Sequence, residues 1–191
     1  MTSLKEAILK YSPMPDEILN VVLNKFTEEH FKKRSIAEHQ GKRCHKLYFI
    51  SEGMARLYYN RNGKEITGWF SKEGDFITAN DSFFQKKTSW LNLEFIEHSK
   101  VFSITVSDLE ELFDKYHEVE RFGRKLTYDL LEILSEKMYT LLFQPAEKRY
   151  QLLQVHYPEV VARAPLGDIA SYLGISQETL SRIRAHKSEC N

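Results

Sequence analysis

The sequence predicts an α+β fold, in which an N-terminal β-roll or jelly roll precedes a long helix and a C-terminal helix-turn-helix. Three observations lead to this prediction. Short runs of β-forming residues alternate with turn residues between about residues 27 and 106, a pattern typical of sandwiches and jelly rolls. Residues 117–143 carry apolar side chains at helical spacing. The C-terminal part holds two short helical segments on either side of a glycine. We therefore expect three parts: 1–116, 117–143 and 145–191.

The composition of the chain excludes a disordered protein, and its charge balance is compatible with most classes of soluble globular protein. The chain has 191 residues, of which 42% are hydrophobic and 28% charged, so it can bury one large or two small cores. Basic and acidic residues balance at 27 each, for a formal net charge of zero. A nucleic-acid-binding protein usually carries a basic surplus. Binding to nucleic acid would therefore require local clustering of basic residues.

Cysteine content and hydropathy predict a cytoplasmic protein with no membrane partner. The two cysteines, Cys44 and Cys190, build neither a disulfide framework nor an iron–sulfur cluster within one chain. This favours a reducing compartment. Residues 1–6 are already charged, unlike a signal peptide. No apolar run approaches the roughly 20 residues of a membrane span.

Residues 4–24 predict two short helices, separated at Pro13 and Pro15. The strands then follow, with a compact apolar run at 47–50 and further β-forming runs at 54–59, 65–70, 91–95 and 102–106. Between two of these runs, Asn62-Gly63 is a strong hairpin signal, because both residues tolerate positive φ. Ser107 to Glu110 has the pattern of a capping box and marks the return to helix.

The helix over 117–143 has more apolar surface than one partner face requires. We predict that it packs against its own β-domain and against the same helix of a second subunit. The alternative is that both apolar faces pack within one monomer. Pro145 ends this helix and begins a new one over 146–155. The residues predicted to form the dimer helix are Phe122, Leu126, Leu130, Ile133, Met138 and Leu141.

The most informative stretch, residues 165–183, has the pattern of a helix, a tight turn and a second helix. Ile169, Ala170 and Leu173 form the apolar face of the first helix, and Gly174 supplies the turn. Ser176 is placed to cap the second helix, whose Leu180 and Ile183 face inward. A generic helical hairpin with a solvated polar face is the alternative interpretation.

The outward residues of the second helix have the chemistry of a base reader. An arginine there can donate two hydrogen bonds to guanine, and a glutamate can accept one from cytosine. A recognition helix presents such residues to the major groove. Basic residues one turn further on are expected to contact phosphate. The predicted DNA-binding residues are Gln177, Glu178, Ser181, Arg182, Arg184 and Lys187.

From about Thr27 to Lys187 the chain resembles the Crp/Fnr family of bacterial transcription regulators. The likeness lies in residues 47–53 (Leu-Tyr-Phe-Ile-Ser-Glu-Gly), in Gly74-Asp75-Phe76, in the long helix and in the helix-turn-helix. The resemblance implies a cyclic-nucleotide-binding-like roll as sensor, a parallel homodimer, double-stranded DNA with a palindromic promoter site, and RNA polymerase as a further partner. The helix pattern Glu178, Ser181 and Arg182 is similar to that of Fnr-like readers, which implies a TTGA-type half-site.

The effector region departs from the family pattern. Nucleotide-binding members carry Gly-Glu shortly after Gly-Asp-Phe, and then an arginine that pairs with the cyclic phosphate. Here Gly74-Asp75-Phe76 continues into Ile77-Thr78-Ala79, and the later stretch is Lys86-Lys87-Thr88. Lysine does not reproduce the arginine fork, although Lys86 or Lys87 could serve as a point charge. We therefore expect no cyclic AMP and no other identifiable cofactor. The candidate effector pocket comprises Trp69, Asn80, Ser82, Thr88 and Ser89.

Two other family features are expected to be missing. The N-terminal cysteine cluster of an Fnr-type oxygen sensor has no counterpart here. The sequence ends at Asn191, about one turn past the second helix. We therefore expect the fold to be winged-helix-like with a truncated wing.

Two rival functions compete with this interpretation. A cupin-type metalloenzyme would need two or three histidines and a carboxylate converging on a metal, but the histidines are scattered singly. With no nucleophile–base pattern or phosphate loop either, we expect no enzyme activity. The second rival is a sensor module that acts only through protein contacts, and the zero net charge is what keeps it open.

Overall fold

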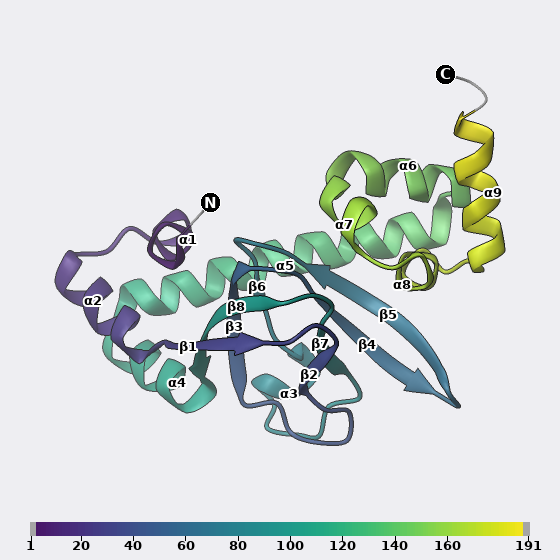
Figure 1. Cartoon of the computed structure of the whole chain (residues 1–191). Coiled ribbons are helices and arrows are strands. Elements are labelled where there is room, and N and C mark those ends of the chain that lie inside the picture. Colours follow the sequence, from purple (N-terminus) through teal and green to yellow (C-terminus); the bar gives the residue numbers. More distant parts are fainter. Residues whose placement is uncertain (1–2, 189–191) are drawn as a thin grey trace.

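The computed structural model describes residues 3–188, with side chains described as far as residue 185. A β-roll lies beneath the first half of a long helix, α5 (His117–Phe143), and a bundle of short helices sits on the second half (Figure 1). The α+β architecture and the order of its parts are those predicted from the sequence. No helix in the described residues is long and apolar enough to cross a membrane.

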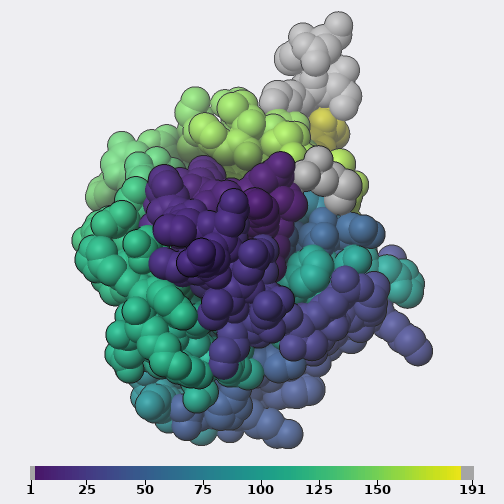
Figure 2. Space-filling view, turned by 90° about the vertical axis from the view of Figure 1, so that its left-hand side faces the viewer, coloured from purple at the N-terminus to yellow at the C-terminus, as the bar shows by residue number. Residues whose placement is uncertain are grey.

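The N-terminal helices are α1 (Leu4–Tyr11) and α2 (Asp16–Lys25), as the two prolines predict. Ser3 and Glu6 form a capping box that satisfies the first backbone amides of α1. Leu4 and Ile8 are buried in the same core as residues of α4 and α5. On the side of the molecule shown in Figure 2, this purple N-terminal segment covers the teal helices.

The roll consists of two four-stranded antiparallel sheets, in the orders β1-β8-β3-β6 and β2-β7-β4-β5. Apolar residues from both sheets fill the space between them, among them Ile50, Leu57 and Phe95. The strands are β1 (Thr27–Phe31), β2 (Ser35–Glu38), β3 (Lys46–Glu52), β4 (Ala55–Arg61), β5 (Lys64–Ser71), β6 (Phe76–Ile77), β7 (Asn92–Phe95) and β8 (Ser99–Thr105).

The β4–β5 hairpin turns at Asn62 and Gly63, which have φ of 54° and 81°. Both values lie in the left-handed region, which Asn and Gly occupy more readily than other residues. The sequence prediction of this hairpin is confirmed. Figure 1 shows the hairpin running beneath α8 (Leu166–Tyr172), with its tip directed away from the C-terminal helices.

Helix α4 (Val106–Lys115) begins earlier than predicted, and its cap is a different residue. Thr105 ends β8 in an extended conformation, and its hydroxyl accepts a hydrogen bond from the backbone amide of Asp108 at 3.1 Å. Ser107 already lies inside the first turn, so the predicted capping box at Ser107–Glu110 is wrong. The strand delivers its last residue into the capping position, which the local pattern alone did not reveal.

Helix α5 spans the predicted 117–143, but its apolar faces differ from the prediction. Phe122 is buried against the roll, Leu126 packs on the same core, and Leu130 lines a small cavity there. These three thus pack on the roll of their own chain, and Leu126 and Leu130 stay partly exposed. Ile133 is partly buried and faces the C-terminal helices. Of the predicted dimer residues, only Met138 and Leu141 are exposed.

A different set of residues forms the exposed apolar stripe of α5. At about 100° per residue, these positions lie within about 60° of one line along the helix. Leu131 and Met138 are 62% and 61% exposed, which is unusual for large apolar side chains that recur on one face. We call this set the α5 stripe: Tyr128, Leu131, Leu134, Met138 and Leu142.

The C-terminal helices are α6 (Ala146–His156), α7 (Pro158–Arg163), α8 (Leu166–Tyr172) and α9 (Gln177–Ser188). Their apolar core is continuous with the roll. Met54, Phe70 and Ile96 of the roll belong to the same buried cluster as Ile169 and Leu180. The remaining short helix, α3 (Asn80–Phe83), lies within the roll.

Candidate nucleic-acid interface

Helices α8 and α9 form the predicted helix-turn-helix. Ile169, Ala170 and Leu173 are buried, and Gly174 between the helices has φ of 67°. Gly174 takes the left-handed turn conformation that side chains resist. The Ser176 hydroxyl accepts a hydrogen bond from the amide of Thr179 at 3.2 Å, which caps α9.

The polar face of α9 points into solvent. Gln177, Glu178, Ser181 and Arg182 are all exposed, while Leu180 on the opposite face is fully buried. A hydrogen bond to Ser176 lowers the pKa of Glu178, and its own backbone amide and the charge of Arg182 act in the same direction. Arg182 lies 3.5 Å from the Thr179 hydroxyl, one turn back on the same helix. The face therefore presents one acid, one guanidinium and two neutral hydrogen-bonding groups.

The two residues predicted for phosphate contact differ from this set. Arg184 is partly buried, and its guanidinium lies 5.5 Å from the ring centre of Tyr150 on α6. It packs back onto the bundle through a cation–π contact rather than standing on the outward face. Its contact with phosphate stays a prediction. The side chain of Lys187 lies outside the described residues.

A buried ionic cluster holds α8 against the roll. Arg56 on β4, only 2% exposed, donates from Nη1 to Asp168 on α8 at 2.9 Å. Its Nε donates to Glu94 on β7 at 2.6 Å, and its Nη2 pairs with Glu65. Arg34 donates to the same two buried carboxylates, at 3.0 Å to Glu94 and 3.1 Å to Asp168. Two guanidinium groups thus face three carboxylates across the contact.

This ionic cluster determines the position of α8 on the roll more than it adds to the stability of the fold. Burial raises the pKa of Asp168, and the charges of Arg56 and Arg34 act against that rise. Removing charges from water costs about as much as their mutual attraction returns, so a buried ion pair contributes little net stability. A displaced α8 would, however, leave Arg56 buried without one of its partners. The cluster therefore strongly disfavours other placements of the helix.

Further hydrogen bonds join α8 and α5 to strand β5 of the roll. The hydroxyl of Ser171 accepts from the amide of Thr67 at 2.9 Å and donates to the carbonyl of Glu65 at 3.1 Å. The Lys137 ammonium donates to the carbonyl of Gly68 and lies 3.7 Å from the ring centre of Tyr172. Backbone groups of β5, a strand with a free edge in its sheet, are thereby satisfied by α5 and α8.

The opposite edge of the helical bundle is tied to the roll by Arg163 on α7. Its Nη1 and Nη2 donate to both carboxylate oxygens of Glu73, at 2.8 and 2.7 Å, and it also pairs with Glu97. Burial acts to raise the pKa of Glu73, but Arg163 and backbone amides outweigh it and lower the value to about 2. The C-terminal helical bundle is thus bound to the roll at two separate points, one on α8 and one on α7.

The roll encloses a cavity of about 70 Å³ beside α5, close to the predicted effector pocket. Trp69 and Asn80 line it, as predicted, together with apolar residues of α5. No lysine or arginine is among the lining residues. The volume is enough for one or two water molecules, but it is far below the roughly 300 Å³ at which ligand pockets begin.

The other predicted pocket residues support local structure instead. Ser82 accepts from the amide of Cys44 at 2.9 Å and donates to the carbonyl of Lys87. Ser89 donates to Asp81 at 2.9 Å. Thr88 is exposed, and its backbone forms an isolated antiparallel β-bridge with Arg43. None of these three residues is part of the lining of this cavity. Lys86 and Lys87 are exposed and lie outside the cavity lining.

The chain is similar to a known domain family and to several solved structures. Residues 28–116 match the family model described as the cyclic nucleotide-binding domain. The structure is similar to FixK2 from Bradyrhizobium japonicum, with a TM-score of 0.72, 22% identity and coverage of 84% of this chain and 83% of that one. It is also similar to a crp/fnr-family protein from Eubacterium rectale, with a TM-score of 0.73, 15% identity and coverage of 92% and 85%.

A third similar structure is a CooA mutant from Carboxydothermus hydrogenoformans, with a TM-score of 0.67, 18% identity and coverage of 91% and 84%. The chain has the Crp/Fnr regulator fold, with a cyclic nucleotide-binding-type domain. At the level of sequence, no curated protein matches it. The matched domain of this Crp/Fnr fold ends at residue 116, just before α5 begins.

Sequence reasoning missed the residues that join the two halves of the Crp/Fnr fold. Arg56 and Asp168 are 112 positions apart, so no spacing rule connects them. A signal was nevertheless present, because Arg56 and Glu94 each interrupt an apolar strand, and charged residues are rarely buried without a partner. Sequence alone could not name the partner. Within residues 3–188, no group of three or more histidine, cysteine or acidic side chains is placed to hold a metal ion.

Proposed function

We propose that this chain is a DNA-binding transcription regulator that recognises a palindromic promoter site as a homodimer, and that its role is not catalytic. The exposed polar face of α9 carries the proposal. Glu178 and Arg182 stand in solvent on a helix whose other face is anchored by the buried Leu180. A solvated helix face with this chemistry is what direct reading of base edges requires.

In the proposed complex, α9 enters the major groove with its N-terminal part foremost. Arg182 donates two hydrogen bonds to guanine O6 and N7, and Glu178 accepts from the exocyclic amine of cytosine. Gln177 and Ser181 contact neighbouring base edges or phosphates. The expected half-site is of the TTGA type. Phosphate contacts supply much of the affinity, so binding should weaken steeply with salt.

The α5 stripe supports the homodimer. Large apolar side chains that recur along one exposed face are costly in a monomer, and the stripe has the spacing of a two-stranded coiled-coil seam. A second copy of the same helix is self-complementary about a twofold axis. Two copies of α9 would then read half-sites about 34 Å apart, one turn of the duplex.

The proposed regulator does not use cyclic AMP in the roll. Its cavity of about 70 Å³ is lined without a lysine or arginine. A phosphate buried there would lack a charge partner, which is costly. We therefore propose that any effector binds elsewhere or differs in chemistry.

Selection of bound sites from a random duplex library, followed by binding titrations, tests the proposal. The wild-type chain should enrich a palindrome and bind it with an affinity that falls with salt. Arg182→Ala should lose at least tenfold in affinity for that site. Arg61→Ala, which removes a cation from the tip of the β4–β5 hairpin, should bind as the wild type does. Failure to enrich any duplex would favour the alternative of a module that contacts only proteins.

A further inference from the structure

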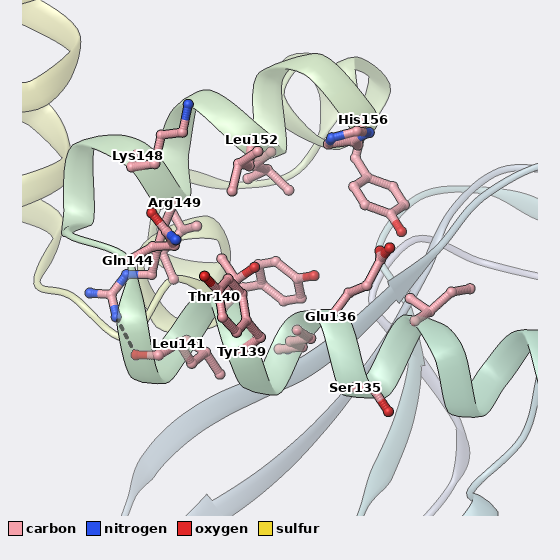
Figure 3. Close-up of a pocket in the computed structure, with 16 residues that line it drawn as sticks. Ser135, Glu136, Tyr139, Thr140, Leu141, Gln144, Lys148, Arg149, Leu152 and His156 are labelled. Atoms are coloured by element: carbon pink, nitrogen blue, oxygen red, sulfur yellow. Dashed lines mark hydrogen bonds between the residues drawn. The ribbon is translucent and has the colours of Figure 1, made fainter.

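A second concave site in this protein lies outside the roll. A cleft of about 770 Å³ is lined by residues of α5, α6 and α8 and of the segments that directly follow these helices. Figure 3 shows α5 forming its floor and α6 its roof, with Glu136, Tyr139 and Thr140 reaching in from the floor. This volume falls in the range of small-molecule sites, which occur preferentially where domains meet. It is also about ten times that of the roll cavity.

The cleft is not the surface left for a second subunit. At about 100° per residue, Lys137, Thr140 and Gln144 lie roughly opposite the α5 stripe. They face the helix-turn-helix of their own chain instead, as their place in the cleft lining shows. Ser135 in the cleft lining lies within the angular range of the stripe, so the dimer surface borders the cleft. A homodimer formed through the α5 stripe would leave the part of the floor at Lys137, Thr140 and Gln144 open to a ligand.

The charged groups of the cleft are mostly cations. Lys137, Lys148 and Arg149 line it, against one carboxylate, that of Glu136. None of these three cations forms an ion pair within the described part of the chain, although sixteen such contacts occur elsewhere in it. Figure 3 shows Lys148 on the rim, with its ammonium turned outward. Unpaired positive charge in a concave site attracts anions.

Two of the cations retain capacity for a ligand. Arg149 donates from Nη1 to the carbonyl of Leu141 at 3.3 Å, while its buried Nε has no hydrogen-bond partner among the described residues. Burial lowers the pKa of Lys137 to about 7, because no nearby carboxylate offsets its loss of hydration. An anion in the cleft would supply the missing opposite charge and raise that pKa again.

The apolar lining completes the recognition chemistry. Tyr139, Tyr157 and Tyr172 offer ring faces, and Leu152 and Leu173 offer aliphatic surface. Tyrosine rings bind flat aromatic groups through stacked or edge contacts. We propose that the cleft binds a small organic anion that carries an aromatic ring, and that the bound molecule sets the position of the helix-turn-helix relative to α5. The second half of this proposal rests on the proposed function in DNA binding, whereas the first half does not.

A matched pair of fluorescent probes tests the site in the full chain. The anion 8-anilinonaphthalene-1-sulfonate and the neutral N-phenyl-1-naphthylamine share their ring system and differ in the sulfonate. The double variant Lys148→Gln/Arg149→Gln should weaken binding of the anion about tenfold, because the lining of the cleft loses two positive charges. It should leave binding of the neutral probe within twofold. The control, Lys86→Gln/Lys87→Gln, removes the same charge from the roll and should change neither.

A second pair of variants covers the possibility that loss of Arg149 disturbs the end of α5. Leu152→Trp adds bulk inside the cleft and should weaken both probes at least tenfold. Val155→Trp places the same side chain on the same helix at a position that is 72% exposed and outside the cleft lining. It should bind as the wild type does. Circular dichroism and the melting temperature of each variant report whether it is folded.

Three results would overturn the site: no binding of the anion by the wild type, an equal loss in the control double variant, or undiminished binding in Leu152→Trp. Because no DNA is present in these titrations, they stand apart from the proposed function. A chain that binds the anion in the cleft and no duplex contradicts the proposed function alone. The regulatory half predicts that the anion changes affinity for the selected duplex at least threefold in the wild type and not in Leu152→Trp. An unchanged affinity in the wild type would overturn that half.

Discussion

Asp168 on the first helix of the helix-turn-helix accepts hydrogen bonds from two arginines of the β-roll, Arg56 at 2.9 Å and Arg34 at 3.1 Å. The carboxylate joins parts of the chain that sequence alone separates into a sensor and a reading module. Through it, the position of α8, and with it that of α9, depends on the arrangement of strands β4 and β7 (Figure 1).

Asp168→Ala should lower the free energy of unfolding by about 3 kcal/mol, because it leaves the fully buried Arg56 with one partner fewer. Urea denaturation followed by circular dichroism measures the change. Asp114→Ala removes an exposed carboxylate and should cost less than about 0.5 kcal/mol. Equal effects of the two substitutions would contradict the role given to the cluster.

Stability should depend on pH through Lys137. Its pKa is about 7 in the folded protein and about 10.4 in an unfolded chain, so between these values the unfolded state binds more protons. The contribution of Lys137 to the free energy of unfolding should therefore rise with pH from about 7 to 10, by up to about 1 kcal/mol per unit, and be flat below 7. Lys137→Met should gain stability relative to the wild type at pH 6 and lose that gain by pH 9. A difference between the two proteins that does not vary with pH would contradict this.

The α5 stripe should determine the oligomeric state. Leu131→Glu combined with Met138→Glu places two charges in the predicted apolar seam, which should convert a dimer into a monomer. Sedimentation velocity measures the change. Lys125→Glu introduces the same side chain at an exposed position of α5 outside the stripe and should remain dimeric. A wild-type chain that sediments as a monomer at all concentrations would refute the dimer.

Gly174→Ala should cost about 1 kcal/mol. The residue has φ of 67°, a conformation that is strained by roughly this amount once a Cβ is present. The added atom itself has room, since it would meet Leu141 at 3.8 Å. The cost should therefore come from the backbone and appear in thermal denaturation. A loss above about 3 kcal/mol would mean that packing, not backbone conformation, decides this position.

The parts of the fold that could be predicted are those specified by local chemistry. Asn62-Gly63, Gly174 and Ser176 each fix a turn or a cap by their own conformational preference, and the sequence prediction is confirmed at all three. The capping residue of α4 was misplaced because Thr105 belongs to a strand whose end depends on pairing with the distant β3. Periodicity alone also could not say which of the apolar faces of α5 the roll covers.

The candidate site divides in the same way. The outward face of α9 follows from helical spacing, so the sequence alone is enough to place Glu178 and Arg182 on it. The effector pocket could not be placed, because its prediction relied on the position of a loop rather than on a volume. Ser82 lies in α3 and Ser89 in the segment before β7, and their hydroxyls are used for local hydrogen bonds. The cleft at the helical junction brings together residues of three helices, α5, α6 and α8, which no local pattern links.

The continuous core beneath α8 limits how the two halves can be exchanged between proteins. Met54, Phe70 and Ile96 of the roll are buried with Ile169 and Leu180, and Asp168 must meet Arg56 above them. A helix-turn-helix transplanted from another protein would seat on this roll only if it brought a carboxylate to the place of Asp168 and small or apolar residues around it. Exchange of the C-terminal helices on this roll is thus restricted by one acidic position and its neighbours, whatever the length of the connecting segment.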